Sequence, residues 1–208
     1  MKVMVFGAAS RVGQLVVAKA LGHGHDVLAV SYQDPVPIHH ERLVTRQGDV
    51  CDVGFVRGVV AEADAVIFAV STGRGAARRS HEEGIANVIH AMAENDVSRL
   101  AVLSAAGTFA RRDRMLPISR RLWIATTARA AYDELESMER RVMATGFAWT
   151  IIRPYRMTDD PASGHYRVSL DEQLLPKASR IPRGDVAAML VKSVETDAFF
   201  RRAVAVAT

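Results

Sequence analysis

The chain has 208 residues, 49% of them hydrophobic and 24% charged, and its 27 basic and 23 acidic residues give a net charge of +4. These proportions are typical of an ordinary globular protein forming one domain, residues 1–208, and exclude a disordered chain, a collagen-like repeat and a disulfide scaffold. Because the single cysteine, Cys51, can form neither an intramolecular disulfide nor a multi-cysteine metal site, we expect a cytoplasmic protein without a metal centre.

Arginine accounts for 23 of the basic residues and lysine for 4. Most of them have acidic residues nearby, whereas a nucleic-acid-binding surface would be a concentrated basic stripe with interleaved aromatic side chains, so we expect no nucleic-acid partner. Residues 111–129 are the exception, with six arginines and one acid. This run is either a solvated helical face or a lid that attracts a phosphate-bearing ligand. Since no apolar run approaches the roughly 20 residues of a membrane span, no membrane association is expected.

Strand and helix signals alternate along the chain. The first is the apolar run 3–6, which ends at Gly7 and is too short for a signal-peptide core. Residues 107–128 predict only a loop and a short helix. Strands are predicted at 3–6, 26–30, 43–48, 65–70, 100–103, 149–152, 166–170 and 203–206, and helices at 11–22, 53–62, 80–95, 129–145 and 185–194.

This alternation predicts an α/β fold, a doubly wound parallel sheet with helices on both faces. The fully apolar run 65–70 is typical of a strand that is covered on both faces. The alternating run 166–170 instead predicts a small surface strand, and with it a small C-terminal lobe on the substrate side. Ligands of doubly wound sheets bind beyond the carboxyl ends of the strands, where the strand order switches.

A turn of small residues joins the first predicted strand to the first helix: Gly7-Ala8-Ala9-Ser10-Arg11-Val12-Gly13. In such a turn the backbone N–H groups approach a pyrophosphate, which lies at the positive end of the helix. Gly7 would make the tight turn and Gly13 would let the helix pack close to the sheet, while Ser10 occupies the usual place of the middle glycine. Strand, turn, helix and second strand fall within about 30 residues, the context that dinucleotide binding requires. The alternative is a purely structural turn.

The end of the second strand indicates which dinucleotide is bound. NAD-specific proteins place an acid there to hold the ribose hydroxyls, but this chain has Ser31 at that end and no acid before Asp34. Arg11 lies in the phosphate loop and could pair its guanidinium with a 2′-phosphate. The sequence therefore favours NADP(H) over NAD(H), although Arg11 is also compatible with an exposed residue of the first helical turn.

Five segments of the chain resemble the atypical short-chain dehydrogenase/reductase group: GAASRVG at 7–13, GDV at 48–50, AVIFAVS at 65–71, LSAAG at 103–107 and TIIRPYRMTDDPASGHYRVSL at 150–170. Within this group the chain is most similar to small NAD(P)H-binding proteins akin to biliverdin-IXβ reductase/flavin reductase and to NmrA-like proteins. The resemblance implies an NADP-dependent Rossmann fold with the substrate lying over the nicotinamide. The cofactor-binding residues that it implies, beyond the phosphate loop and Ser31, are Asp49 and Val50 at the adenine, Ala69, Val70 and Ser71 at the ribose and phosphates, Ser104 and Ala105 beside the nicotinamide, and Pro154 in the loop under the carboxamide.

The chain also departs from the group's pattern. The second glycine of the turn is Ser10, and the arginine that is common at the end of the second strand is Ser31. Typical members use Tyr-x-x-x-Lys, in which the lysine lowers the tyrosine pKa for proton transfer. The candidate here, Tyr132, is followed by Glu136, and a nearby carboxylate would raise a tyrosine pKa. We therefore expect Tyr132 to be an ordinary helix residue.

Three side chains remain as candidates around the expected nicotinamide position: Ser104, Tyr155 and Arg156. The Ser104 hydroxyl could bind substrate or carboxamide, and Arg156 could bind an anionic substrate, polarise a carbonyl or pair with Asp159 or Asp160. The predicted activity is NADPH-dependent hydride transfer to a small conjugated acceptor, a flavin, quinone or polycyclic ketone, by a monomer or homodimer. The alternative is a non-catalytic dinucleotide-binding regulator of the NmrA-like type.

Overall fold

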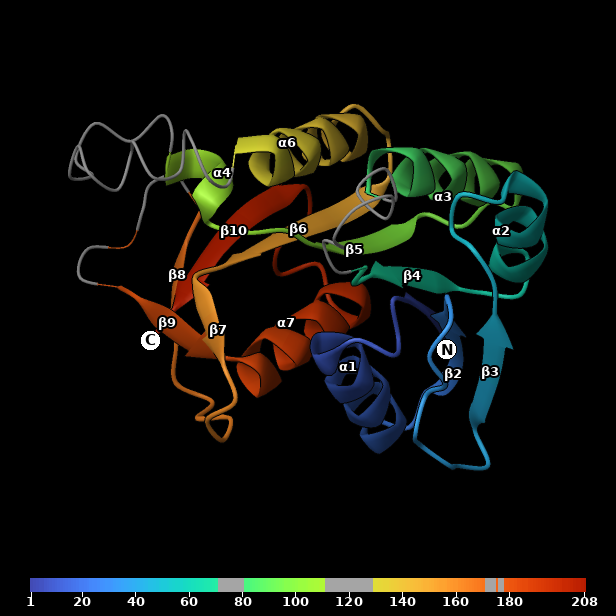
Figure 1. Cartoon of the computed structure of the whole chain (residues 1–208), viewed down its shortest axis with the longest axis horizontal. Coiled ribbons are helices and arrows are strands. Elements are labelled where there is room, and N and C mark those ends of the chain that lie inside the picture. The colour runs from blue at the N-terminus through green and yellow to red at the C-terminus, as the bar shows by residue number, and fades with distance from the viewer. Residues whose placement is uncertain (71–80, 111–128, 171–174, 176–177) are drawn as a thin grey trace.

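A computed structural model describes residues 1–70, 81–110, 129–170, 175 and 178–208, with the side chains of 109 and 110 excepted. An eight-stranded sheet runs through the molecule with helices above and below it (Figure 1). None of the described helices is long and apolar enough to cross a membrane. The elements are β1 Lys2–Phe6, α1 Arg11–Gly22, β2 Asp26–Ser31, β3 Leu43–Gln47, α2 Val53–Val60, β4 Ala65–Phe68, α3 Glu82–Glu94, β5 Arg99–Leu103, α4 Gly107–Ala110, α6 Arg129–Met143, β6 Ala148–Pro154, β7 Arg156–Thr158, β8 Arg167–Ser169, β9 Arg180–Pro182, α7 Arg183–Glu195 and β10 Arg202–Ala207.

The sheet has the strand order β3-β2-β1-β4-β5-β6-β10-β8. All its strands pair in parallel except β8, which pairs antiparallel with β10. Parallel strands need long crossover connections, and the helices between them supply these. The central strands are almost fully buried because helices cover both faces, as the continuous apolar runs predict. The doubly wound Rossmann-like fold predicted from the sequence is confirmed.

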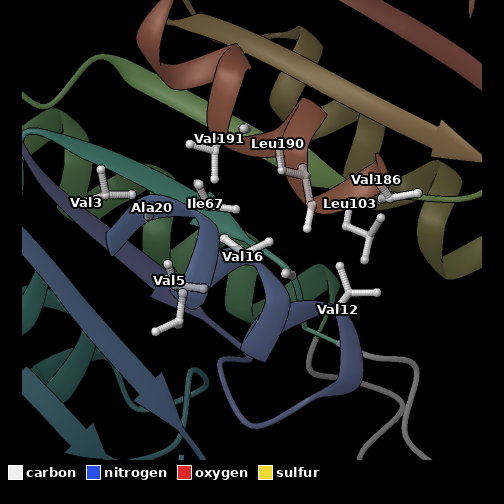
Figure 2. Close-up of a cluster of buried hydrophobic side chains, with 14 of the residues drawn as sticks. Val3, Val5, Val12, Val16, Ala20, Ile67, Leu103, Val186, Leu190 and Val191 are labelled. Atoms are coloured by element: carbon white, nitrogen blue, oxygen red, sulfur yellow. The ribbon is translucent and has the colours of Figure 1, made fainter. Parts of the chain in front are cut away.

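Two apolar clusters hold the helices to the sheet. Helices α1 and α7 pack against one face, and α2, α3 and α6 pack against the other. Figure 2 shows the first cluster, in which the side chains of α1 and α7 meet those of β1, β4 and β5. Val12, Val16 and Ala20 of α1 recur at helical spacing and are at most 4% exposed. The same spacing in the sequence predicted this helix with its correct ends.

A small lobe continues from the carboxyl end of β6, on the side where the sequence predicted it. Strands β7 and β9 form a separate two-stranded parallel sheet there. The small surface strand predicted at 166–170 is confirmed as β8, which is largely exposed and joins the main sheet as its antiparallel edge strand. Strands β7 and β9 were missed, since three residues are too few to show a period of two.

The far ends of α1 and α7 are joined by one carboxylate. Oε1 of Glu195, the last residue of α7, accepts hydrogen bonds from Nδ1 of His23 at 2.8 Å and from Nε2 of His25 at 2.7 Å. Partial burial alone would raise the pKa of the Glu195 carboxyl, but the hydrogen bonds and charges of the two histidines outweigh it and hold this pKa below its ordinary value. The carboxylate therefore stabilises the pairing of the two helices only while it is ionised.

Glu195→Gln is expected to lower the free energy of unfolding by about 1–2 kcal/mol near pH 6, because it removes a carboxylate that receives two hydrogen bonds. A carboxyl with a lowered folded-state pKa stabilises the protein above its unfolded pKa, about 4.3 for glutamate, and this contribution is lost as the pH falls through the folded-state value. The stability difference between the wild type and the variant should therefore shrink below about pH 4. Urea unfolding between pH 6 and pH 4 measures the stability difference, with the exposed Glu62→Gln as control. A stability difference between wild type and Glu195→Gln that is equal at both pH values would contradict the role assigned to the ionised carboxylate.

Candidate functional site

The carboxyl ends of β1, β4, β5 and β6 lie together on one edge of the sheet. The strand order switches at β1, which lies between β2 and β4. Ligands of doubly wound folds bind in the crevice beyond such a switch point. The predicted site residues follow these strand ends, so the fold brings the phosphate loop, the end of β4 and the ends of β5 and β6 to the same edge.

The turn after β1 depends on Gly7, whose φ of +78° lies in the left-handed region that side chains disfavour. A Cβ atom on Gly7 would also lie 2.5 Å from the carbonyl oxygen of Ala69. Ser10 has an ordinary φ of −67° and caps α1, with its Oγ accepting a hydrogen bond from the amide of Gly13 at 3.0 Å. Serine can therefore replace the middle glycine here, because that position needs a cap and no unusual backbone.

Gly13 lets the first turn of α1 pack onto the loop before it. A Cβ atom on Gly13 would overlap the carbonyl oxygen of Gly7 and lie 2.8 Å from the Cα of Ala8. The amides of Arg11 and Val12 make no hydrogen bond with the described residues and point out of the helix start, as the first amides of a helix do. Two unpaired N–H groups at a positive helix end, held in place by a tight glycine turn, are a chemical fit for a pyrophosphate.

Arg11 is held by an acid from the small lobe. Its Nη1 atom lies 3.1 Å from Oδ2 of Asp159, and Arg183, the first residue of α7, lies 2.5 Å from Oδ1 of the same carboxylate. The Arg11 guanidinium thus lies at the carboxylate that also binds the start of α7. Its side chain is 74% exposed, and exposed ion pairs of this kind contribute only about 0–1 kcal/mol, so a phosphate can compete with Asp159.

The predicted adenine side lies at the ends of β2 and β3. Ser31 is buried, and the loop after β3 brings Asp49 and Val50 beside the crevice edge. Asp49 Oδ1 accepts a hydrogen bond from the amide of Cys51 at 2.8 Å, and the Val50 carbonyl accepts one from the Asn87 side chain at 3.1 Å. The Val50 side chain, which is 8% exposed, therefore lies in a fixed loop and makes this part of the crevice edge apolar.

Cys51 is not a nucleophile in this loop. Burial, together with the charges of Asp49 and Glu83, raises the pKa of its thiol to about 11. At that value about 0.1% of the thiol is ionised at pH 8, and the thiol itself reacts poorly.

The end of β4 is fixed by a buried histidine that the sequence did not single out as functional. His81 is 1% exposed, and its Nε2 atom lies 2.9 Å from the carbonyl oxygen of Val70. Its backbone amide donates to Oε1 of Glu134 in α6 at 3.2 Å. This contact ties the residues predicted at the ribose, Ala69 and Val70, to α3 and α6. Ser71, predicted with them, lies outside the described residues, as do positions 111–128 of the arginine-rich run.

The ends of β5 and β6 carry a buried polar network. Ser104 Oγ donates to Oε1 of Glu139 at 2.5 Å, and Arg153 holds both oxygens of that carboxylate, Nε at 2.8 Å from Oε1 and Nη2 at 2.6 Å from Oε2. Ser104, Glu139 and Arg153 are 6%, 4% and 3% exposed. A bidentate pair of this geometry fixes all three side chains and balances the buried charges.

This network sets what Ser104 can offer to a ligand. A serine hydroxyl has one proton and two acceptor lone pairs, and the proton of Ser104 is given to Glu139. Ser104 is therefore an acceptor toward the crevice, which suits an N–H or O–H group of a ligand. The amides of Ser104 and Ala106 donate to the carbonyls of Ile152 and Pro154, so Ser104, Ala105 and Pro154 lie side by side.

The two residues after Pro154 have different surroundings. The Tyr155 hydroxyl accepts a hydrogen bond from the amide of Leu175 at 2.6 Å and lies 3.4 Å from the Leu175 carbonyl, which ties β7 to the segment before β9. Arg156 is exposed on β7 and, within the described part of the chain, forms no ion pair. The predicted alternative of pairing with Asp159 or Asp160 is thus absent there, since Asp159 pairs with Arg11 and Arg183.

No tyrosine–lysine pair of the usual type forms among the described residues. The Tyr132 ring lies against Gly107, where any added Cβ would overlap it, so this tyrosine packs on α4. Lys2 begins β1, and Lys19 and Lys192 lie in the last turns of α1 and α7, at the amino ends of the strands and away from the site. The remaining lysine, Lys177, lies outside the described residues.

Glu139 and Arg153 are the site residues that sequence reasoning missed, although the sequence holds a signal for each. The buried residues of α6 are Leu135, Met138, Glu139 and Val142, so the glutamate occupies a position of the apolar stripe. Arg153 is the one charged residue of β6, whose other residues are mostly apolar. A charge at each of two buried positions predicts that they pair, because an unpaired buried charge is costly.

Known structures share this fold. The oxidoreductase ylbE from Lactococcus lactis matches 100% of the chain and 91% of its own length at 18% identity and a TM-score of 0.83. A short-chain dehydrogenase/reductase from Veillonella parvula in complex with NADP matches 100% of the chain and 94% of its own length at 18% identity and a TM-score of 0.82. A Rossmann-fold NAD(P)-binding protein from Shigella flexneri matches 99% of the chain and 92% of its own length at 19% identity and a TM-score of 0.75.

A family description fits the sequence itself. Residues 7–197 match the model of the NAD(P)H-binding family, from the first glycine of the phosphate loop to just beyond α7. The match includes the turn after β1 and the carboxyl ends of β4, β5 and β6. The chain therefore belongs to the NAD(P)H-binding family.

Proposed function

We propose that the protein is an NADPH-dependent reductase of the atypical short-chain dehydrogenase/reductase type that transfers hydride to a conjugated acceptor, a flavin, quinone or polycyclic ketone. The observation that carries this proposal concerns two neighbouring parts of the crevice. The turn after β1 and the start of α1 form a cradle for a dinucleotide, and the ends of β5 and β6 beside it have no tyrosine–lysine proton donor among the described residues. The family match supports NAD(P)-dependent oxidoreductase chemistry in general.

The cradle assigns roles to residues on the switch-point edge. The amides of Arg11 and Val12 would bind the pyrophosphate, and Val50 would contact the adenine. Ala69 and Val70 would border the adenosine ribose and phosphates, and Ser104 would accept a hydrogen bond from the carboxamide. The nicotinamide supplies the hydride when it is bound. The protein's own contribution is to orient the two reactants and exclude water from between them.

The acceptor class follows from the lack of a tyrosine–lysine proton donor among the described residues. An isolated ketone needs a proton at its oxygen as hydride arrives, which a tuned tyrosine would give. A flavin or quinone spreads the incoming charge over its ring system, so it can accept hydride first and take its proton from solvent afterwards. The Ser104 proton is directed at Glu139, and the carboxylate is already held by Arg153, so this network binds and positions without supplying a proton.

Turnover should separate the reductase from the alternative regulator. The unmodified protein is expected to oxidise NADPH when offered riboflavin or 1,4-naphthoquinone. Ser104→Ala should slow that reaction about tenfold, as expected for one lost positioning hydrogen bond, and Tyr132→Phe should change it by less than about twofold. NADPH absorbance in a stopped-flow instrument measures all three. An inactive Tyr132→Phe variant would indicate a conventional carbonyl reductase, and binding without oxidation of NADPH would indicate a regulator.

The role of the phosphate loop can be tested at Ser10, where a larger side chain causes no clash with the backbone. Ser10→Asp keeps a good helix cap but places a negative charge where the pyrophosphate would lie, so NADPH affinity should fall at least about tenfold. Ser10→Asn has the same shape without the charge and should weaken binding far less. Fluorescence titration measures both, with circular dichroism to establish folding. Equal affinities for the Asp and Asn variants would refute the assigned phosphate position.

Cofactor choice gives a further prediction. NADPH should bind more tightly than NADH, and Arg11→Ala should remove most of that preference, because a charged hydrogen bond to phosphate contributes about 1.5–3 kcal/mol. Asp159→Asn releases Arg11 from its ion pair and should strengthen NADPH binding by up to about fivefold. Titrations of wild type and both variants with NADPH and with NADH measure the preference. If Arg11→Ala weakens NADPH and NADH equally, Arg11 acts on a phosphate that both share.

A further inference from the structure

Two arginines stand side by side in the small lobe. In the parallel β7–β9 pair, Arg156 is the register partner of Arg180. Side chains at matched positions of neighbouring strands lie on the same face. Met157 and Ile181, the next residues on each strand, pack into the α1–α7 cluster, so the two arginines face away from it. Both are exposed.

The described acids of the lobe do not neutralise this pair. Asp159 is taken by Arg11 and Arg183, and the Asp160 carboxylate accepts a hydrogen bond from Thr158 at 2.9 Å. Neither Arg156 nor Arg180 has an ion-pair partner within the described residues.

The buried acid of the lobe, Asp185, is also occupied. It accepts hydrogen bonds from both the amide and the hydroxyl of Ser163 at 3.0 Å and from the amide of Gly164 at 2.9 Å. Its carboxylate therefore holds the turn before β8, and the acids that the structure describes leave the two arginines of β7 and β9 without a counter-charge.

The backbone holds the two charges together. Tyr155 precedes Arg156, and its amide donates to the Val206 carbonyl of β10 while its hydroxyl bonds the backbone of Leu175. The Arg180 carbonyl accepts from both the amide and the hydroxyl of Thr208. Like charges at neighbouring positions repel, and strands fixed in this way cannot move apart to relieve the repulsion. A bound anion would relieve it, and paired guanidinium groups bind oxyanions through several hydrogen bonds.

The position of the pair indicates which ligand carries the anion. Arg156 follows Pro154 by two residues at the carboxyl end of β6, on the acceptor side of the crevice. The adenosine half of a dinucleotide would lie toward β2 and β3, on the other side of β1.

We propose that Arg156 and Arg180 form an anion site that binds a phosphate, sulfonate or carboxylate substituent of the hydride acceptor. The conjugated ring then lies toward Ser104 and the charged substituent toward β7 and β9. This inference rests on the proposed reductase function for the identity of the ligand as an acceptor. The anion site itself is accessible to a binding measurement that requires no turnover.

Riboflavin and FMN are suitable probes, because they share one ring system and differ by a phosphate. Flavin fluorescence quenching gives both dissociation constants for protein saturated with NADP⁺, which cannot reduce the flavin. FMN should bind about 10–100-fold more tightly than riboflavin. Arg156→Gln/Arg180→Gln should bring that ratio close to one, with riboflavin as the internal reference for ring binding.

The control variant is Arg57→Gln/Arg202→Gln, which removes the same two charges near the amino ends of the strands. This variant should keep the FMN preference of the wild type. If both double variants lose the FMN preference equally, the preference arises from net charge alone and the proposal is overturned. Equal binding of FMN and riboflavin to the wild type would also overturn it. The proposal would also be overturned if Arg156→Gln/Arg180→Gln lost as much affinity for NADP⁺ as for FMN, since the two arginines would then bind a phosphate of the cofactor.

Turnover of 1,4-naphthoquinone against its 2-sulfonate repeats the test on a second ring system. A sulfonate preference in KM that is lost in Arg156→Gln/Arg180→Gln supports the proposal. If neither quinone nor flavin is reduced but the FMN preference still depends on both arginines, the reductase function fails and the anion site stands. If both quinones are reduced with the same KM and the variant changes neither, the function stands and the anion site fails.

Discussion

The close approach of three backbone segments at the switch point is the constraint on which the site depends. The turn after β1 touches the end of β4 at Gly7, and α1 touches the same turn at Gly13, with no room for a side chain at either place. This contact sets the direction of α1, and with it the apolar face that packs against α7 and the sheet (Figure 2). The helix start that faces the crevice is therefore a product of the same packing that builds the core.

A second, polar centre joins the elements on the acceptor side. Glu139 of α6 lies between Arg153 of β6 and Ser104 after β5, all nearly buried. Removing one member of a buried ion pair costs about 3–5 kcal/mol, because the other charge is left without a partner. The network is thus costly to lose, and it fixes Ser104 as an acceptor. Geometry at the ends of β5 and β6 is set by electrostatics, whereas geometry at the turn after β1 is set by the absence of side chains at Gly7 and Gly13.

Periodicity and turn chemistry were enough to predict the doubly wound sheet and the helix that follows its first strand. They could not predict β7 and β9, whose pairing joins residues distant in sequence. The direction of Arg11 was also out of reach, because Asp159 lies 148 positions away. The Ser104 network was missed for a related reason, since Glu139 and Arg153 lie on different elements and 14 positions apart in the sequence. Tertiary contacts between charged residues carry no local period.

The attachment of the small lobe has a consequence for how such a protein can diversify. One residue separates β6 from β7, and β9 runs directly into α7, so the strands that carry Arg156 and Arg180 are anchored to the core without a hinge. The connection between β7 and β8 begins at Asp159, which pairs with Arg11 in the turn after β1, and continues through Ser163 and Gly164, which Asp185 holds. A change in the length of this connection would therefore act on the start of α1 as well as on the lobe. Variation of the lobe is in this way coupled to the turn after β1.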